Sequence, residues 1–392
     1  MERRDFLKVA ALTGAAIAVP GLEAAASSVA GSVLGSASAG AGSVLGSDAA
    51  GAGSVLGSGA GSASAGAGVE RYADKPVQKF RFRPDGKFKV LQFTDTHYIA
   101  GNPKSERALK NVIQMLDIEK PDLVIHTGDI VYGNPADAAA REIFQPLVDR
   151  GAPFAVALGN HESDFAMKRE EIFEVIRSIK GNINTPMRPD IYGCSNDVIT
   201  LSSENGVEQV FYLFDSGAYL ECLGEKGYDY IRHSQIEWYR CHSEAITAAN
   251  SGKPVSSLAF FHIPVREFCD AVRDTHRDMV GVFCEEPCPS RYNSGLVANF
   301  LEKGDVHSII CGHDHDNDFV LKHGNMFYLY GRFSGCDNEY NNIGPSGARI
   351  FEFTKGQPGY RTYIRKYGQD TIEQDLHLTR GMSHLLATLP KM

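Results

Sequence analysis

Five short polar segments of this 392-residue chain each follow an apolar run and combine carboxylates, imidazoles and one amide. These side chains are the ligands of metal-dependent hydrolytic centres. A two-metal site needs one ligand shared between the ions and about three more for each. The chain supplies such a set, with one histidine to spare, in Asp95-Thr96-His97, Gly128-Asp129, Gly159-Asn160-His161-Glu162, Phe261-His262 and Gly312-His313-Asp314-His315.

The spacing within the segments supports metal binding. Asp95 and His97 are two residues apart, so on extended backbone both side chains point to one face and can bind the same ion. His313 and His315 have the same spacing, near enough to serve neighbouring metals. A lone Asp-x-His, His-x-His or strand-end Gly-Asp is ordinary polar or turn structure. Only the whole ordered set indicates a two-metal centre.

The apolar runs predict the elements that position these residues. Strands are expected at 88–93, 121–126 and 153–158, alternating with helices at 105–116, 137–149 and 164–180, the first capped by Ser105. This alternation predicts parallel strands whose carboxyl ends gather ligands. Further strands are expected at 198–201, 210–214, 257–261, 306–311, 326–330 and 348–353, with helices at 234–249 and 292–303. The count favours an α/β fold with two stacked sheets flanked by helices.

The ordered pattern Asp-x-His, Gly-Asp, Gly-Asn-His-Glu, His and Gly-His-x-His resembles the calcineurin-like metallophosphoesterase superfamily over residues 88–320. The sequence around these motifs is similar to the purple acid phosphatase branch that includes plant type-29-like and fungal Dcr2-like phosphatases. Its supporting segments are Leu258–Pro264, Asn293–Gly295, Gly312–Asp318 and Tyr330–Arg332. The resemblance implies a four-layer α/β/β/α sandwich of two stacked mixed sheets and phosphoester hydrolysis.

The resemblance also implies roles for single residues. The first metal would take Asp95, His97, Asp129 and His315, and the second Asp129, Asn160, His262 and His313. A water bridging the metals at Asp129 would become hydroxide and attack phosphorus in line. His161 would face the substrate, stabilising phosphoryl oxygens or protonating the leaving group, and Glu162 would orient it. Asn293 and Arg332 would touch the substrate phosphate or have structural roles. Imidazole and carboxylate ligands admit Fe, Mn, Zn or Ni.

Tyr132 departs from one expected pattern. Typical purple acid phosphatases have a tyrosine three residues after the bridging aspartate and lack the histidine of Asp-x-His. Here Tyr132 and His97 are both present. Either Tyr132 binds a ferric ion and His97 steps back, or His97 binds and Tyr132 packs beside it. We favour His97.

The N-terminal part of the sequence indicates export and is not expected to belong to the folded domain. Residues 1–26 read as a twin-arginine signal peptide, with Arg3-Arg4, an apolar stretch and a small-residue cleavage site at 24–26. Residues 27–69 repeat Gly-Ser-Val-Leu-Gly-Ser and read as a disordered Gly/Ala/Ser linker. Residues 70–392 remain for the phosphoesterase domain. The twin-arginine export machinery is then a partner, and the mature chain is expected to be periplasmic or extracellular with no transmembrane span.

Charge and cysteine content narrow the functional classes. The net charge is −9 with no basic run beyond the signal, so we expect no nucleic-acid partner. Eight cysteines in an exported protein permit disulfides. Cys284 and Cys288 could pair with each other or with Cys269, whereas Cys311 reads as a buried thiol.

Three functions compete on these residues. The leading hypothesis is an exported phosphomonoesterase for a small phosphorylated substrate or a phosphoprotein. A phosphodiesterase or nucleotide-type hydrolase on the same centre is the nearer alternative, because the metals do not decide the ester type. The least favoured alternative is a non-catalytic binding module carried by the linker at residues 27–69. Substrate specificity is expected from residues 181–230 and 265–292.

Overall fold

The computed structural model describes residues 77–222, 224–274, 278–336 and 338–385, all within one compact unit that spans Gly61–Met392. The predicted signal peptide (1–26) and linker (27–69) lie outside the described residues. Within the described ranges, no helix has the length and apolarity needed to cross a bilayer.

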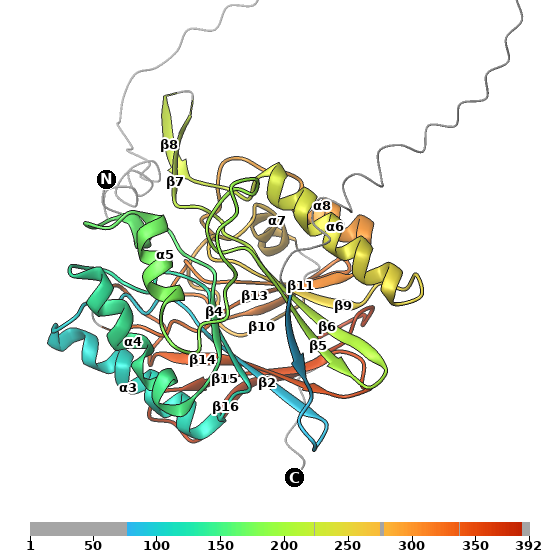
Figure 1. Cartoon of the computed structure of the whole chain (residues 1–392), viewed down its shortest axis with the longest axis horizontal. Coiled ribbons are helices and arrows are strands. Elements are labelled where there is room, and N and C mark those ends of the chain that lie inside the picture. The colour runs from blue at the N-terminus through green and yellow to red at the C-terminus, as the bar shows by residue number, and fades with distance from the viewer. Residues whose placement is uncertain (1–76, 223, 275–277, 337, 386–392) are drawn as a thin grey trace, which may run out of the picture. The chain divides into compact units, whose positions relative to one another are not determined.

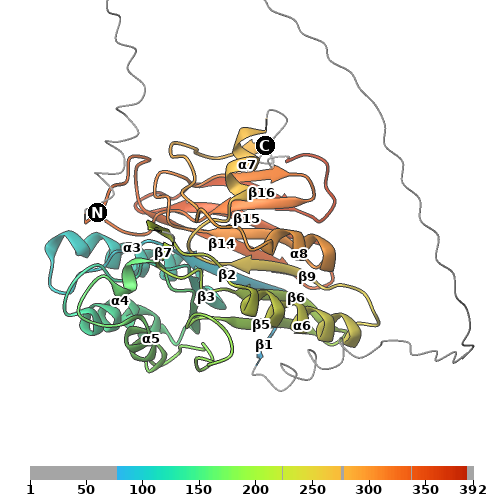
Figure 2. The same ribbon diagram turned by 90° about the horizontal axis from the view of Figure 1, so that it is seen from above.

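A six-stranded sheet carries the first three site segments. Its order is β16-β15-β14-β2-β3-β4, and Figure 2 shows β16, β15, β14, β2 and β3 side by side. β2, β3 and β4 are parallel to one another, as predicted, and β14, β15 and β16 complete the sheet with antiparallel pairing. The strands are β2 (Lys87–Phe93), β3 (Leu123–His126), β4 (Phe154–Val156), β14 (Gly347–Thr354), β15 (Tyr360–Lys366) and β16 (Ile372–Leu378).

An eight-stranded sheet carries the last two site segments. Its order is β1-β5-β6-β9-β11-β13-β12-β10, with β9 and β11 as parallel neighbours near the middle. The strands are β1 (Gln78–Arg81), β5 (Asp197–Ser203), β6 (Gly206–Leu213), β9 (Ser256–Phe260), β10 (Asp278–Val280), β11 (Val306–Cys311), β12 (Val320–His323) and β13 (Met326–Tyr330).

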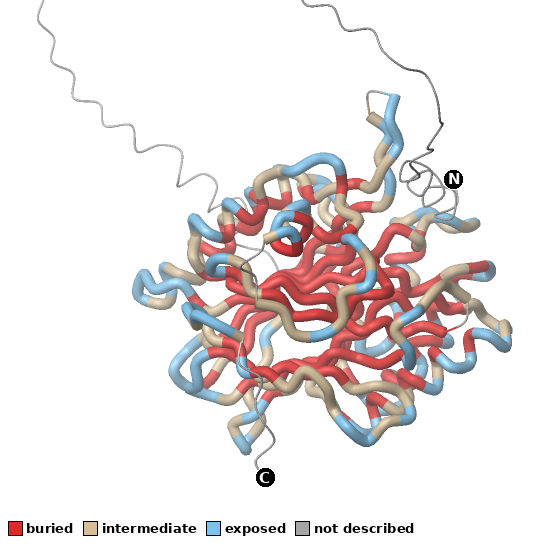
Figure 3. Tube along the Cα trace, turned by 180° about the vertical axis from the view of Figure 1, so that it is seen from behind, coloured by how far each residue is buried: buried red, intermediate tan, exposed pale blue. Residues whose placement is uncertain are grey.

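The two sheets stack face to face with helices on both outer faces (Figure 1). Apolar residues of α3 (Glu106–Glu119), α4 (Ala136–Arg150) and α5 (Arg169–Arg177) pack on the six-stranded sheet. Those of α6 (His233–Ala249), α7 (Glu267–Arg273) and α8 (Leu296–Lys303) pack on the eight-stranded sheet. A third cluster joins the inner faces, and Figure 3 shows the buried strands at the centre. The predicted four-layer α/β/β/α sandwich is confirmed.

Details of the local structure differ from the sequence-based expectations. The side chain of Ser105 does not cap α3. Its hydroxyl accepts the backbone N–H of Ile99, and a one-turn 3-10 helix, Pro103–Ser105, precedes α3. All eight cysteines lie in the described part, where none forms a disulfide, and Cys311 is buried as expected. No disulfide among Cys269, Cys284 and Cys288 is formed.

Candidate metal centre

The five polar segments meet where the two sheets present the carboxyl ends of their parallel strands. Asp95 follows β2, Asp129 follows β3 and Asn160 follows β4, while His262 follows β9 and His313 follows β11. A hydrogen bond of 2.7 Å between the Nδ1 of His262 and the carbonyl of Thr127 joins the loops of the two sheets. The topology thus collects residues that lie far apart in sequence.

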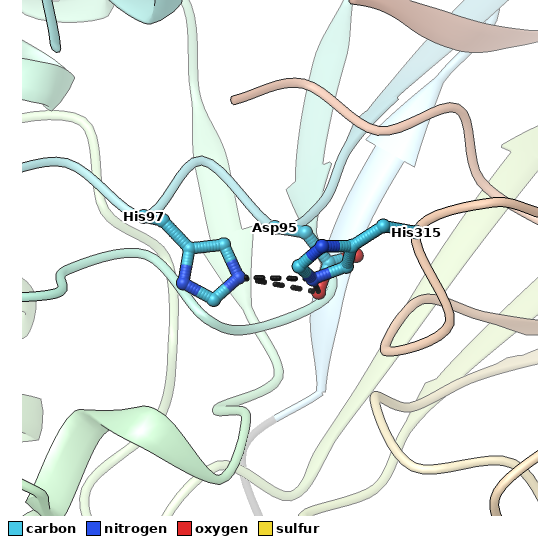
Figure 4. A group of neighbouring side chains, drawn as sticks. All are labelled: Asp95, His97 and His315. Carbon is cyan, nitrogen blue, oxygen red and sulfur yellow. Dashed lines mark hydrogen bonds and ion pairs between the residues drawn. The ribbon is translucent and has the colours of Figure 1, made fainter. Parts of the chain in front are cut away.

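Asp95, His97 and His315 form the first ligand cluster (Figure 4). The Nε2 atoms of His97 and His315 are 3.1 Å apart. Asp95 Oδ1 lies 3.5 Å from His315 Nε2 and 3.9 Å from His97 Nε2. All three side chains are buried. These are the residues that the family resemblance assigns to the first metal, together with Asp129.

Asp129, His262 and His313 form the second cluster, with Asn160 beside it. The Nε2 of His262 is 3.1 Å from Asp129 Oδ2 and 3.1 Å from Asn160 Oδ1. The Nδ1 of His313 approaches the same nitrogen at 3.3 Å. Asp129 Oδ2 is also 3.7 Å from His97 Nε2, so one carboxylate reaches both clusters. This is the arrangement expected of a shared ligand.

The donor atoms fit divalent cations. Carbonyl oxygens only accept hydrogen bonds, so Nδ1 of His262 donates to Thr127 and Nδ1 of His315 donates to Tyr340, at 2.7 and 2.9 Å. The Nε2 atom of each neutral imidazole is then a lone-pair donor directed into the clusters. Lone pairs of nitrogen and carboxylate oxygen this close, in a buried site, require a cation or a proton between them. Two metal ions would satisfy every one of them.

The close packing of carboxylates and imidazoles in the two clusters also shifts their pKa values. Burial alone would raise the pKa of Asp95, but the His315 hydrogen bond and the nearby imidazoles lower it to about 2. Burial alone would lower the pKa of His262, but Asp129, by its charge and hydrogen bond, raises it to about 9. The carboxylates are therefore held ionised, and His262 holds a proton until a cation replaces it.

The backbone of the ligand loops is held in an uncommon conformation. Asp95, His97, Asp129 and His313 all have positive φ, at 55°, 45°, 54° and 78°. Non-glycine residues adopt this region rarely, and such residues cluster at functional sites. A Cβ on Gly159 would overlap the backbone nitrogen and Oδ1 of Asp129. The glycine before Asn160 thus lets two ligand loops approach each other closely.

His97, rather than Tyr132, supplies a nitrogen to the first cluster. The ring of Tyr132 packs edge-to-face against His97, with centroids 5.0 Å apart. Burial, followed by a hydrogen bond to Glu339, raises the pKa of Tyr132. The geometry therefore favours His97 as ligand with Tyr132 packed beside it.

His161 lies at the rim of the clusters. Its Nδ1 contacts Asp164 Oδ2 at 2.5 Å, while its Nε2 faces Asp129 Oδ2 at 3.8 Å. The side chain is 19% exposed, so it borders both the ligands and solvent. Burial lowers the pKa of His161, but the charges of Asp129 and Asp164 outweigh that effect and raise it. A protonated imidazole here can hold a phosphoryl oxygen or donate a proton.

The predicted role of Glu162 is wrong. Its carboxylate accepts backbone N–H groups from Gly159 at 2.6 Å, Ile130 at 2.5 Å and Asp129 at 3.3 Å. The residue that contacts the His161 ring is Asp164. Glu162 therefore fastens the Gly128-Asp129 loop to the Gly159-Asn160 loop.

The structure places Arg332 and Asn293 in structural hydrogen bonds. Arg332 is completely buried, pairs with Asp318 at 2.7 Å and donates to the carbonyls of Pro345 and Ile343. The amide of Asn293 donates to Glu267 and accepts from the N–H of Gly295. Of the two roles left open for Arg332 and Asn293, contact with the substrate phosphate or a structural role, the hydrogen bonds support the structural one.

Several functional residues carry no readable sequence signal. Tyr219, on β7 (Tyr219–Cys222), accepts a hydrogen bond of 3.0 Å from Nδ2 of Asn160. The half-buried Arg169 donates to the Gly159 carbonyl and pairs with Asp215 at 2.5 Å. Asp164 is the one such residue that the sequence could have indicated, because it lies three residues after its partner His161. His126, at the end of β3, hydrogen-bonds Thr96 at 3.1 Å and lies outside the two ligand clusters.

Comparison with known proteins agrees with this geometry. The family model for calcineurin-like phosphoesterase matches residues 88–317. The chain belongs to this family. Probable inactive purple acid phosphatase 14 of Arabidopsis thaliana is 29% identical over 76% of this chain and 82% of its own length. Phosphatase DCR2 of Saccharomyces cerevisiae is 28% identical over 64% of this chain and 48% of its own length. The resemblance seen in the motifs is confirmed.

A solved structure shows the same fold. A dimetal phosphatase from Danio rerio superimposes with a TM-score of 0.51, covering 73% of this chain and 98% of that one, at 14% sequence identity.

Proposed function

We propose that this chain is a metal-dependent phosphomonoesterase with two metal ions per chain. The observation that carries the proposal is the position of Asp129, whose Oδ2 lies between the two ligand clusters and faces the Nε2 of His161. The similarity to Phosphatase DCR2 supports a phosphatase. The relatives named "probable inactive" make catalysis the point to test.

The residues suit a phosphate monoester. When bound, two divalent cations would acidify a coordinated water and offset the charge of the phosphoryl oxygens. Asp95 and Asp129 are the only carboxylates in the two clusters described above, so the loaded site has net positive charge and attracts a dianion. His161 Nε2 would hold the leaving oxygen or protonate it, and Asp164 would keep the ring in place. Asn160 would add a neutral oxygen ligand.

The direct test compares two esters on protein stripped of metal and reloaded with Fe, Mn, Zn or Ni. We expect 4-nitrophenyl phosphate to be hydrolysed with a higher kcat/KM than bis(4-nitrophenyl) phosphate. His161→Ala should lower kcat by about 10²–10⁴-fold. His233→Ala, an exposed histidine at the start of α6, should not change it. Faster turnover of the diester would establish a phosphodiesterase instead, and turnover of neither ester would leave a binding module.

We also propose that the protein is exported by the twin-arginine route and acts on a small phosphorylated substrate or a phosphoprotein outside the cytoplasm. The support is the Arg3-Arg4 pair followed by an apolar stretch. Replacing both arginines with lysine should retain the full-length chain in the cytoplasmic fraction. Unchanged export of that variant would contradict the route.

A further inference from the structure

A small hairpin of the chain reaches the candidate metal centre. β7 (Tyr219–Cys222) and β8 (Glu225–Tyr228) form a two-stranded sheet of their own, and the hairpin projects beyond the two large sheets in Figure 1. It belongs to the 181–230 region, from which specificity was expected. Both tyrosines at its base contact residues of the centre.

The hydroxyl of Tyr219 is held by hydrogen bonds, whereas its ring is exposed to solvent. The hydroxyl accepts from Nδ2 of Asn160 at 3.0 Å and lies 3.4 Å from Asp164 Oδ2 and 3.5 Å from His161 Nδ1. Even so, the residue is 51% exposed. Large apolar or aromatic side chains this exposed are few among the described residues, and none of the others shares a hydrogen bond with a candidate ligand. The ring therefore presents a face at the mouth of the centre.

Tyr228 extends this aromatic surface to the second cluster. Its ring stacks on Tyr219 with centroids 5.9 Å apart and an interplanar angle of 28°. It also packs edge-on against His313 at 4.4 Å. The two stacked rings thus form one wall that runs from His161 to His313. We call this pair the tyrosine wall.

A second aromatic group borders His161 away from the hairpin. Tyr132 packs against His161 with centroids 4.9 Å apart, and the half-buried Phe165 packs against Tyr132 at 5.6 Å. The proton donor proposed for the leaving group is therefore surrounded by aromatic rings. A flat apolar leaving group would be desolvated against these rings.

We propose that the tyrosine wall selects phosphomonoesters with an aromatic leaving group, and that Tyr219 is the specificity-determining residue. This inference rests on the proposed phosphatase function. In an aryl phosphate the ring is bonded directly to the ester oxygen, so it lies beside His161, where Tyr219 is placed. In a nucleoside monophosphate a sugar separates the base from phosphorus, which would carry the base beyond this wall.

The test measures the preference for phenyl phosphate over cyclohexyl phosphate, which differ in aromaticity but hardly in size. The intrinsic reactivities of these esters also differ, but that difference is the same for every variant. We expect Tyr219→Leu to lower the ratio of the two kcat/KM values about threefold to tenfold, the worth of one aromatic contact. Tyr219→Phe should keep the ratio near that of the wild type, because the ring remains.

Two controls make the result specific. Tyr367→Leu, which follows β15 near α3, should leave both kcat/KM values unchanged. Inhibition of the wild type should be stronger by phenylphosphonate than by cyclohexylphosphonate, a readout that needs no folded variant. A ratio in Tyr219→Leu within twofold of the wild type would overturn the inference. So would equal losses in Tyr219→Leu and Tyr219→Phe, since the hydroxyl would then be the cause.

The outcomes also separate this inference from the proposed function. If metal-loaded wild type hydrolyses both esters but Tyr219→Leu does not change their ratio, only the aromatic preference fails. A Tyr219-dependent preference for a nucleoside monophosphate over phenyl phosphate would likewise overturn the aryl assignment. If neither ester is hydrolysed, the phosphatase proposal itself fails.

Discussion

Single side chains decide how the two ligand loops are held. Glu162 is buried, and its one carboxylate accepts N–H groups from both the Asp129 loop and the Asn160 loop. Burial and the charge of Asp129 raise the pKa of Glu162, and the backbone hydrogen bonds offset this only in part. The position of the shared ligand thus depends on a residue that does not itself reach a metal.

The first prediction concerns Glu162→Gln. An amide keeps the shape but faces backbone N–H groups with an NH₂, so we expect about 2 kcal/mol less stability and about 10–100-fold weaker metal binding. Urea unfolding and calorimetric metal titration measure the two effects, with the exposed Glu170→Gln on α5 as the matched control. Unchanged metal affinity would show that the loops do not need this carboxylate.

The second prediction concerns Asp164→Asn. Asp164 contributes to the raised pKa of His161, so its removal should lower that pKa. The protonated imidazole would then be lost at lower pH, and the alkaline limb of the kcat profile should move toward acid. We also expect kcat to fall about tenfold, while metal stoichiometry stays the same. A pH profile identical to that of the wild type would refute the positioning role of Asp164.

At this scale the sequence was informative about residue type and less so about partners. The candidate ligands follow from carboxylates and imidazoles after apolar runs, and the structure brings all seven together. The family resemblance implied that Glu162 orients His161, but the 3-10 helix His161–Ser163 directs the Glu162 carboxylate to the backbone instead. Tyr219 reaches the same histidine from 58 residues away, which no local pattern predicts.

The elements hold the site by bringing strand ends into close contact. The third prediction tests this with Gly159→Ala, whose added methyl group would overlap the backbone nitrogen and Oδ1 of Asp129. We expect a loss of about 1–3 kcal/mol in stability and weaker binding of both metals. In Gly227→Ala on β8 the methyl group meets open space, so metal binding should be normal. Equal metal affinities of the two variants would contradict the proposed close approach.

The burial of each element explains whether it could be predicted from the sequence. The strands β2, β3, β9 and β11 each contain a short stretch of buried apolar residues, a pattern that the sequence shows directly. β16 reads Ile-Glu-Gln-Asp-Leu-His-Leu and lies at a sheet edge, half exposed, so its charges hide the strand. The β7–β8 hairpin contributes little to the core and was equally hidden. The elements that carry the candidate ligands were therefore visible in the sequence, whereas the hairpin proposed to border the substrate was not.

The whole molecule couples metal binding to pH. The fourth prediction concerns the metal-free protein, in which the pKa of His262 is raised from 6.5 to about 9. This group stabilises the fold fully below pH 6.5, and its contribution of about 1–3 kcal/mol is lost as the pH rises toward 9. Bound metal occupies the same nitrogen and removes this dependence. The difference in Tm between loaded and chelated protein should therefore grow from pH 6.5 to 9, and a constant difference would contradict it.

The central claim is that both clusters bind metal and that hydrolysis needs both ions. The most direct measurement is stepwise metal titration of the chelated protein, with bound metal and hydrolysis of 4-nitrophenyl phosphate followed in the same samples. We predict two ions per chain, with activity rising mainly as the second site fills. Full activity at one ion per chain, or a protein with both sites filled that hydrolyses no phosphomonoester, would contradict the account.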